Sequence, residues 1–165
     1  MTTLAQIATR AANALADAGA ATWSAATLQE WVNEAIRDYS QHFPATITQT
    51  LLPTTGDHDH ALNSRYQGIL LVEYPVGEDP PQYLTRLSRS HPDFWLSDDY
   101  YDIEPSGTSS DGPTLYISAN PTTGEQIKVT MHASHEPVTG ATSLIPVYSQ
   151  HEHLLVLFVV WKAHA

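Results

Sequence analysis

The chain has 165 residues, which suits one domain of ordinary size and allows a sizeable hydrophobic core. Its 18 acidic and 7 basic residues give a formal net charge of -11, which excludes a general DNA-binding surface because such surfaces need clustered Lys and Arg. The absence of cysteine excludes disulfides, thiolate metal sites and thiol nucleophiles.

The N-terminal region begins with a capping-box pattern, in which Thr3 is the N-cap and Gln6 reaches back to it. A mostly alanine stripe follows at helical spacing, and Gly19 is expected to end this first helix. Arg10 and Asp17 interrupt the region, so no secretory signal is expected.

A second helix is expected from the N-cap Ser24 to about Phe43, because Pro44 disfavours helical backbone in the residue before it. One side of this helix is broadly apolar. The opposite side carries a row of like charges four residues apart, with one arginine beside it: Glu30, Glu34 and Asp38, with Arg37. Like charges at this spacing destabilise a helix slightly, so the row needs an explanation.

After Pro44 the pattern changes to β-branched residues and turn punctuation, which predicts strands between about Ala45 and Ser134. The expected strands cover residues 46–51, 69–74, 83–87, 115–118 and 126–132. The last two are separated by NPTTGE, which is typical of a hairpin connection. Strands at this spacing predict a small antiparallel sandwich or barrel.

A final helix is expected after Pro146, over about Tyr148 to Ala163. Its apolar run LLVLFVVW has eight residues, whereas a membrane span needs about twenty, so a soluble protein without a membrane contact is predicted. The run is apolar on all sides, so its own fold or other subunits must surround it. The candidate assembly residues of this helix are Leu154, Leu157, Phe158, Val160 and Trp161.

The predicted fold class is therefore α+β, with an N-terminal helix pair and a C-terminal helix packed together around a central antiparallel β-sandwich or barrel-like segment. A single domain is expected over residues 1–165, helical over 1–44, mainly β over 45–145 and helical again over 146–165.

Catalytic and metal-binding motifs are not evident. The sequence HEHLL at His151 is not HExxH, because Leu155 stands where the second ligand belongs, and the paired histidines elsewhere are expected to be solvated or hydrogen-bonded. Motifs for a nucleophile elbow, a phosphate loop or a dinucleotide site are absent. Carboxylate pairs such as Asp98–Asp99 and Asp102–Glu104 suit a glycosidase in principle, but any acidic chain offers such pairs by chance. We expect no catalytic residues, no metal and no cofactor.

Four aromatic residues lie close together in the sequence beside five acids: Phe94, Trp95, Tyr100 and Tyr101. They either pin their own loop to the fold or form a contact surface for a partner, because aromatic residues are enriched at interface cores.

Several stretches resemble the head-tail connector, or adaptor, proteins of tailed bacteriophages. They are TWSAATLQEWVNEAIRDYSQHFP, ILLVEYPVGEDPPQYL, GPTLYISANPTTGEQIKV and LIPVYSQHEHLLVLFVVWKA, which together cover most of the chain. The resemblance implies a structural virion protein, assembled in the host cytoplasm, that forms a ring, commonly a dodecamer, under the portal protein. Such a ring extends the DNA channel used for genome ejection and binds the next neck or tail component. Relatives are expected to continue past the Trp-Lys-Ala end.

In such a ring the acidic row has three possible roles. It lines the channel, where a negative wall lets DNA pass without specific binding; it meets a neighbour's Arg86 or Arg89; or it is a solvated face. Two other functions stay open: a monomeric carbohydrate- or ligand-binding β module that uses the aromatic loop, and a virion-associated cell-wall hydrolase that uses the carboxylates.

Overall fold

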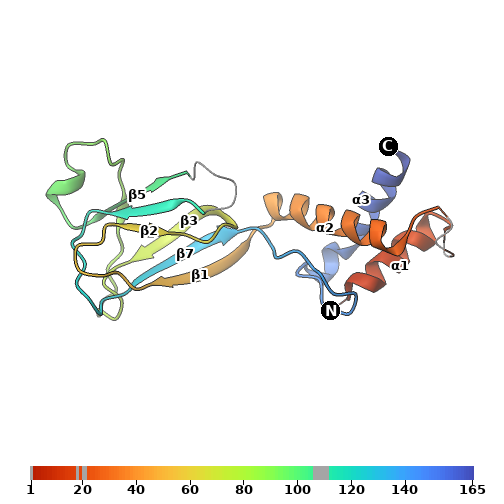
Figure 1. Ribbon diagram of the computed structural model, residues 1–165, viewed down its shortest axis with the longest axis horizontal. Helices are drawn as coiled ribbons and strands as arrows, with labels where there is room; N and C mark the ends of the chain where they lie inside the picture. The colour runs from red at the N-terminus through yellow and green to blue at the C-terminus, as the bar shows by residue number, and fades with distance from the viewer. Residues whose placement is uncertain (1, 18, 20–21, 106–111) are drawn as a thin grey trace. The chain divides into compact units, whose positions relative to one another are not determined.

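The computed structural model describes residues 2–17, 19, 22–105 and 112–165 (Figure 1). The chain divides into two compact units. We call residues 1–44 with 134–165 the helical unit and residues 45–133 the β unit. The expectation of a single domain stays a prediction.

The helical unit holds α1 (Leu4–Ala14), α2 (Ala25–His42) and α3 (Glu152–His164), preceded by a short 3-10 turn η2 (Ser149–His151). The capping box predicted at Thr3 is confirmed, because the Thr3 and Gln6 side chains each bind the other's backbone N–H. Ser24 caps α2 as predicted, since its hydroxyl accepts from the Thr27 backbone N–H at 3.1 Å. Helix α1 ends earlier than expected, before Gly19, and the chain turns at Ala16 with a φ of 55°.

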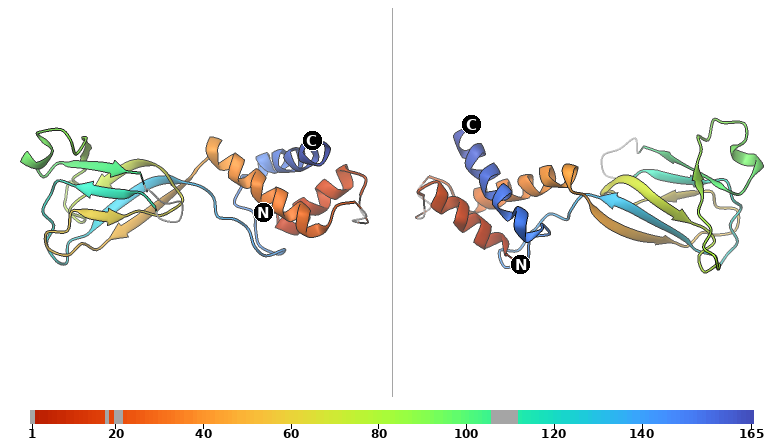
Figure 2. Two further views of the ribbon diagram at one scale, coloured as in Figure 1. Left: turned by 45° about the horizontal axis from the view of Figure 1, so that its top comes forward. Right: turned by 180° about the vertical axis from the view of Figure 1, so that it is seen from behind.

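The three helices contact one another pairwise, and Figure 2 shows them from two further sides. Their shared core is built from apolar side chains of all three helices and of the segment before α3: Leu4, Ile7, Ala8, Ala11, Leu28, Val32, Ala35, Ile36, Tyr39, Val138, Ile145, Leu155 and Val159. The Asn33 side chain holds the 134–145 segment, because it donates to the Val138 carbonyl at 2.9 Å and accepts from the Val138 N–H at 2.8 Å.

The β unit contains two sheets. One has the order β1-β7-β3, formed by β1 (Ala45–Leu51), β7 (Ile127–Ala133) and β3 (Tyr66–Glu73). The other has the order β2-β6-β5-β4, formed by β2 (Asp59–Ala61), β6 (Thr114–Ile117), β5 (Tyr100–Glu104) and β4 (Thr85–Arg86). All pairs are antiparallel except β4 with β5. The α+β fold class is confirmed, and the two sheets are compatible with a sandwich.

Strict alternation of side chains defines the β core. In β7 every second residue, from Ile127 to Ala133, is buried, and the residues between them are half-buried. This is the period of two that a strand with one core face requires. These side chains share one apolar cluster with buried residues of the second sheet such as Leu115 and Ile117.

The predicted hairpin between β6 and β7 is wrong. The turn forms, with Gly124 at a φ of 103° and the Glu125 N–H donating to the Thr122 carbonyl at 3.1 Å. However, β6 pairs with β2 and β5, whereas β7 pairs with β1 and β3, so the turn carries the chain from one sheet to the other. Strands β2 and β5 were also not among the predicted strands.

Candidate interaction surfaces

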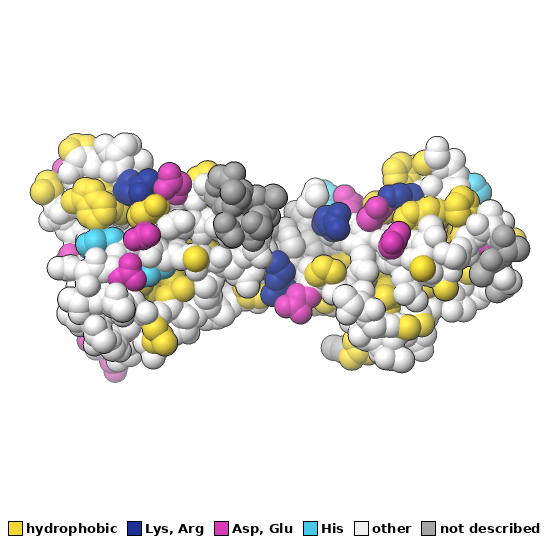
Figure 3. Space-filling view, in the orientation of Figure 1, with side chains coloured by type: hydrophobic (Ala, Val, Ile, Leu, Met, Phe, Trp, Pro, Cys, Tyr) yellow, Lys and Arg dark blue, Asp and Glu magenta, His cyan; other side chains and the backbone are white. Residues whose placement is uncertain are grey.

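Helix α3 has a buried side and an exposed apolar side. Leu155 and Val159 are 1% and 0% exposed in the helical core, whereas Leu154, Leu157 and Trp161 are 40%, 59% and 64% exposed. Of the other candidate assembly residues, Phe158 and Val160 are half-buried, and the Phe158 ring lies 5.8 Å from that of Trp161. The fold therefore leaves large apolar side chains of α3 uncovered, as Figure 3 shows over the helical unit.

The exposed side of α3 continues into an apolar hollow between α3 and α2. The hollow is lined by Ala35, Asp38, Tyr39, His42, Phe43, Leu154, Leu155 and Phe158. One wall is fixed by aromatic contacts, since Tyr39 stacks on Phe43 at 4.9 Å and its hydroxyl lies 3.0 Å from His151 Nδ1. An apolar face and an adjoining hollow together offer a larger contact area than scattered surface leucines.

The acidic row on α2 is not uniform. Glu34 is half-buried and forms an ion pair and hydrogen bond with Lys162 of α3, whereas Glu30, Arg37 and Asp38 are exposed. Lys162 thus offsets the repulsion at the centre of the row and ties α2 to α3. The residue pattern of α2 alone does not indicate this partner, because Glu34 and Lys162 are 128 positions apart in the sequence.

The four aromatic residues of the predicted contact loop have different environments. Phe94, in the 3-10 turn η1 (Phe94–Leu96), is 0% exposed, and Tyr101 is buried in β5 beside the half-buried Tyr100. Trp95 is 52% exposed, and its neighbour Leu96, which the sequence analysis did not single out, is 78% exposed. Only Trp95 of the original four presents a large part of its surface.

Some of the histidines and carboxylates make local contacts, but the expectation that the paired histidines are solvated or hydrogen-bonded does not hold throughout, because His132 Nδ1 is buried without a hydrogen-bond partner among the described residues. His60 in β2 is buried, and this burial lowers its pKa; its Nδ1 lies 3.9 Å from the Asp57 carboxylate, and its Nε2 has no partner among the described residues. Asp102 accepts the Arg89 backbone N–H at 2.8 Å. Within the described residues, no group of three or more His, Cys, Asp or Glu side chains is arranged to hold a metal ion.

Arg89, one of the arginines considered as a partner for the acidic row, is occupied within its own chain. Its guanidinium donates to Glu104 at 3.0 Å and lies 3.7 Å above the Tyr116 ring. Arg86, the other candidate, is exposed in β4.

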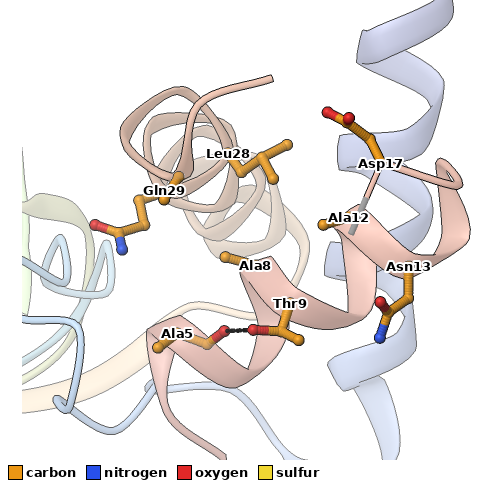
Figure 4. Close-up of a pocket in the computed structure, with 9 residues that line it drawn as sticks. Ala5, Ala8, Thr9, Ala12, Asn13, Asp17, Leu28 and Gln29 are labelled. Atoms are coloured by element: carbon orange, nitrogen blue, oxygen red, sulfur yellow. Dashed lines mark hydrogen bonds between the residues drawn. The ribbon is translucent and has the colours of Figure 1, made fainter. Parts of the chain in front are cut away.

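A further hollow lies between α1 and α2 (Figure 4). Four of its nine lining residues are alanines, Leu28 adds a larger apolar side chain, and the Thr9 hydroxyl donates to the Ala5 carbonyl at 2.8 Å. Asp17 belongs to the lining but already accepts backbone N–H groups, from Thr22 at 3.1 Å and from Trp23 at 2.7 Å. We see no nucleophile with an adjacent base among these lining residues.

An α+β protein with exposed apolar and acidic surfaces has the features of a structural protein that works through contacts with other proteins. The family model of the SU10 adaptor protein matches residues 2–165, and the chain belongs to this family. It is thus a structural adaptor protein of a bacteriophage and a virion component, and the resemblance to phage head-tail adaptors is confirmed. The family is one of structural proteins and not of enzymes.

A comparison with curated proteins gives no match. Within the described residues, no helix combines the length and the apolar character needed to cross a membrane.

Proposed function

We propose that this adaptor is a head-tail connector that forms a ring under the portal protein and links the capsid to the next neck or tail component.

 The ring is proposed to be a dodecamer that extends the DNA channel. The observation that carries the proposal is the apolar face of α3, because Leu157 and Trp161 are more than half exposed on a helix whose other side is core. Obligate interfaces between subunits are rich in such apolar side chains.

A ring explains why one chain leaves this face uncovered. Fully burying a large aliphatic side chain is worth roughly 1.5–3 kcal/mol, so covering Leu154 and Leu157 in every subunit stabilises the assembly. The face is therefore proposed to contact a neighbouring subunit or the portal protein. Assembly takes place in the host cytoplasm, and the finished ring is part of the virion neck.

The net charge of -11 suits a channel through which DNA slides during genome ejection. Each subunit repeats the same acidic surface, and a negative wall repels phosphate, so DNA passes without specific binding. Glu30 and Asp38 are the exposed members of the acidic row and are proposed to line the channel or a subunit interface, with Arg37 beside them. Glu34 has a structural role through Lys162.

The test is the mass of the purified protein, alone and with portal protein, for the parent and two variants. Leu157→Asp places a charge on the α3 face, and Leu52→Asp is the matched control, because Leu52 is 73% exposed in the β unit. We expect Leu157→Asp to remain folded by circular dichroism but to lose the ring, and Leu52→Asp to assemble normally. Normal assembly of Leu157→Asp, or a parent that stays monomeric with portal, would contradict the proposal.

The acidic row is tested separately in assembled particles with Glu30→Lys and Asp38→Lys together, leaving Glu34 and its ion pair intact. A channel role predicts normal ring incorporation and DNA ejection that becomes slower at low salt, because a cationic wall attracts phosphate. An interface role predicts loss of incorporation. A variant that assembles and ejects like the parent at low salt would remove both roles.

A further inference from the structure

The loop between β4 and β5 presents two large apolar side chains at the surface of the β unit. We call residues 88–99 the Trp95 loop. Trp95 and Leu96 are 52% and 78% exposed in it, and Leu96 is the most exposed large apolar residue of the described chain. Figure 1 shows the loop with its short helical turn beside β5, and in Figure 3 hydrophobic side chains gather at this end of the β unit.

The Trp95 loop is held in place by its own contacts. Phe94 is 0% exposed and anchors the turn, and its ring meets that of Trp95 edge-on at 4.7 Å. His58 contacts the Trp95 ring in the same manner at 5.3 Å. The Phe94 and Leu96 N–H groups donate to the carbonyls of His91 and Asp93 at 3.1 and 3.0 Å. An apolar side chain that is already fixed loses less conformational entropy on binding, and Trp is one of the residues enriched at binding hot spots.

The surroundings of the exposed pair are negatively charged. Asp93, Asp98 and Asp99 are exposed in the same loop, and its one arginine, Arg89, is paired with Glu104. Asp98 and Asp99 also line a polar hollow with Glu125, and no Lys or Arg is among the described residues that line it. Across the chain, 12 of the 18 acidic residues lie in the β unit, against 4 of the 7 basic ones. This surface repels nucleic acid and anionic lipid and favours a basic partner.

A second copy of the chain is poorly suited to be that partner. Four of its seven basic side chains are paired internally: Arg10 with Glu152, Arg89 with Glu104, Lys128 with Glu73 and Lys162 with Glu34. A protein with this charge pattern offers few free cations to its own acidic loop, so a different protein fits better.

We propose that the Trp95 loop docks another structural protein of the same virion, through an apolar socket on that protein bordered by Lys or Arg side chains. Trp95 and Leu96 enter the socket, and the carboxylates of Asp98 and Asp99 meet the surrounding cations. The inference rests on the proposed connector function, because it identifies the surface that meets the next component of the particle.

The experiment tests the purified structural proteins of the same phage particle one at a time, by biolayer interferometry against the immobilised full-length chain. Four variants are compared with the parent: Trp95→Ser, Leu96→Ser, Asp98→Asn with Asp99→Asn, and the control Leu52→Ser, which is matched to Leu96 in residue type and exposure. Besides the portal protein, whose binding should not depend on the loop, we expect one other protein to bind. Trp95→Ser and Leu96→Ser should weaken the binding of that protein at least tenfold, and Leu52→Ser should leave it unchanged. The double Asn variant is expected to weaken binding and to flatten its dependence on salt.

Two results would overturn the inference. One is that every protein that binds the parent binds the Trp95 and Leu96 variants equally well. The other is that these variants lose self-association, which would make the loop a subunit contact. Leu96→Ser keeps the test decisive if Trp95→Ser does not fold, because the Leu96 side chain is largely free of packing contacts at 78% exposure. The connector function itself is read from ring formation with portal protein, which the loop variants are expected to retain. Failure of the loop and failure of the ring are therefore distinguishable.

Discussion

Replacing Leu155 with alanine tests whether α3 packs on the helical core as described. Leu155 is 1% exposed and belongs to the same apolar cluster as Ala35, Tyr39 and Val159. Removing a buried leucine side chain costs the transfer free energy and leaves a cavity, which together amount to about 2.7–5 kcal/mol in well-packed cores. Leu155 also borders the hollow between α2 and α3, so partial collapse is possible there, and we expect about 3 kcal/mol.

The matched control is Leu157→Ala, two residues along the same helix but 59% exposed. The Leu157 side chain is not part of the buried cluster, so Leu157→Ala should change the free energy of unfolding of the protein by about 0.5 kcal/mol or less. The difference between the two variants isolates burial from helix propensity, because both exchange the same residue types within one helix.

Urea unfolding followed by tryptophan fluorescence provides the measurement. Trp23 and Trp31, whose rings are 5.1 Å apart, pack against the helical core and report on this unit. With a slope of about 2 kcal/mol per molar urea, a loss of 3 kcal/mol moves the midpoint by about 1.5 M. If Leu155→Ala shifts the midpoint no further than Leu157→Ala, α3 does not contribute its Leu155 side to the core, and the reasoning fails.

Three further outcomes are expected. Because burial lowers the pKa of His60, the unfolded chain binds more protons at His60 than the folded chain as the pH falls. The contribution of neutral His60 to stability is therefore present above about pH 6.5 and lost as the pH falls. Urea midpoints at pH 7.5 and 5 should show this loss, and His60→Leu should reduce it. Asn33→Leu should cost about 1–3 kcal/mol in thermal or urea unfolding, because it leaves the N–H and carbonyl of Val138 without their partner. A double-mutant cycle of Glu34→Gln and Lys162→Gln should give a coupling free energy of about 0.2–1 kcal/mol. This coupling should decrease with salt, since both side chains are about one-third exposed. No coupling at low salt would show that the pair is not formed in solution.

The helices were predictable because their signals are local. A capping box at Thr3 and an N-cap at Ser24 fix two helix starts within a few residues of sequence, and Pro44 fixes an end. The apolar run of the last helix has no polar face in the sequence, and the fold buries only one side of it, so its coverage by other subunits stays a prediction. Its division into buried Leu155 and exposed Leu157 depends on where α1 and α2 lie, which no local pattern contains.

The strands were less predictable because their pairing is not local. The turn before β7 has the chemistry of a hairpin, with a glycine in the left-handed region, but the pairing of β7 with β1 and β3 removes it from β6. The three residues of β2 lie in a stretch of turn-forming residues, so their partner strand β6 decides their conformation. The same holds for Glu34, whose partner Lys162 is brought to it only by the packing of α2 on α3.

The order in which the chain is synthesised gives the β unit a particular consequence. Ala45, the first residue of β1, pairs with Ala133, the last residue of β7. The β unit is therefore one continuous segment whose two ends are neighbours in the sheet. Helices α1 and α2 leave the ribosome before the β unit, yet their core partners Val138, Leu155 and Val159 emerge only after the β unit is complete. During translation the alanine-rich surface of α1 therefore lacks these partners, and all residues of the β unit are available for folding before those of the helical unit are.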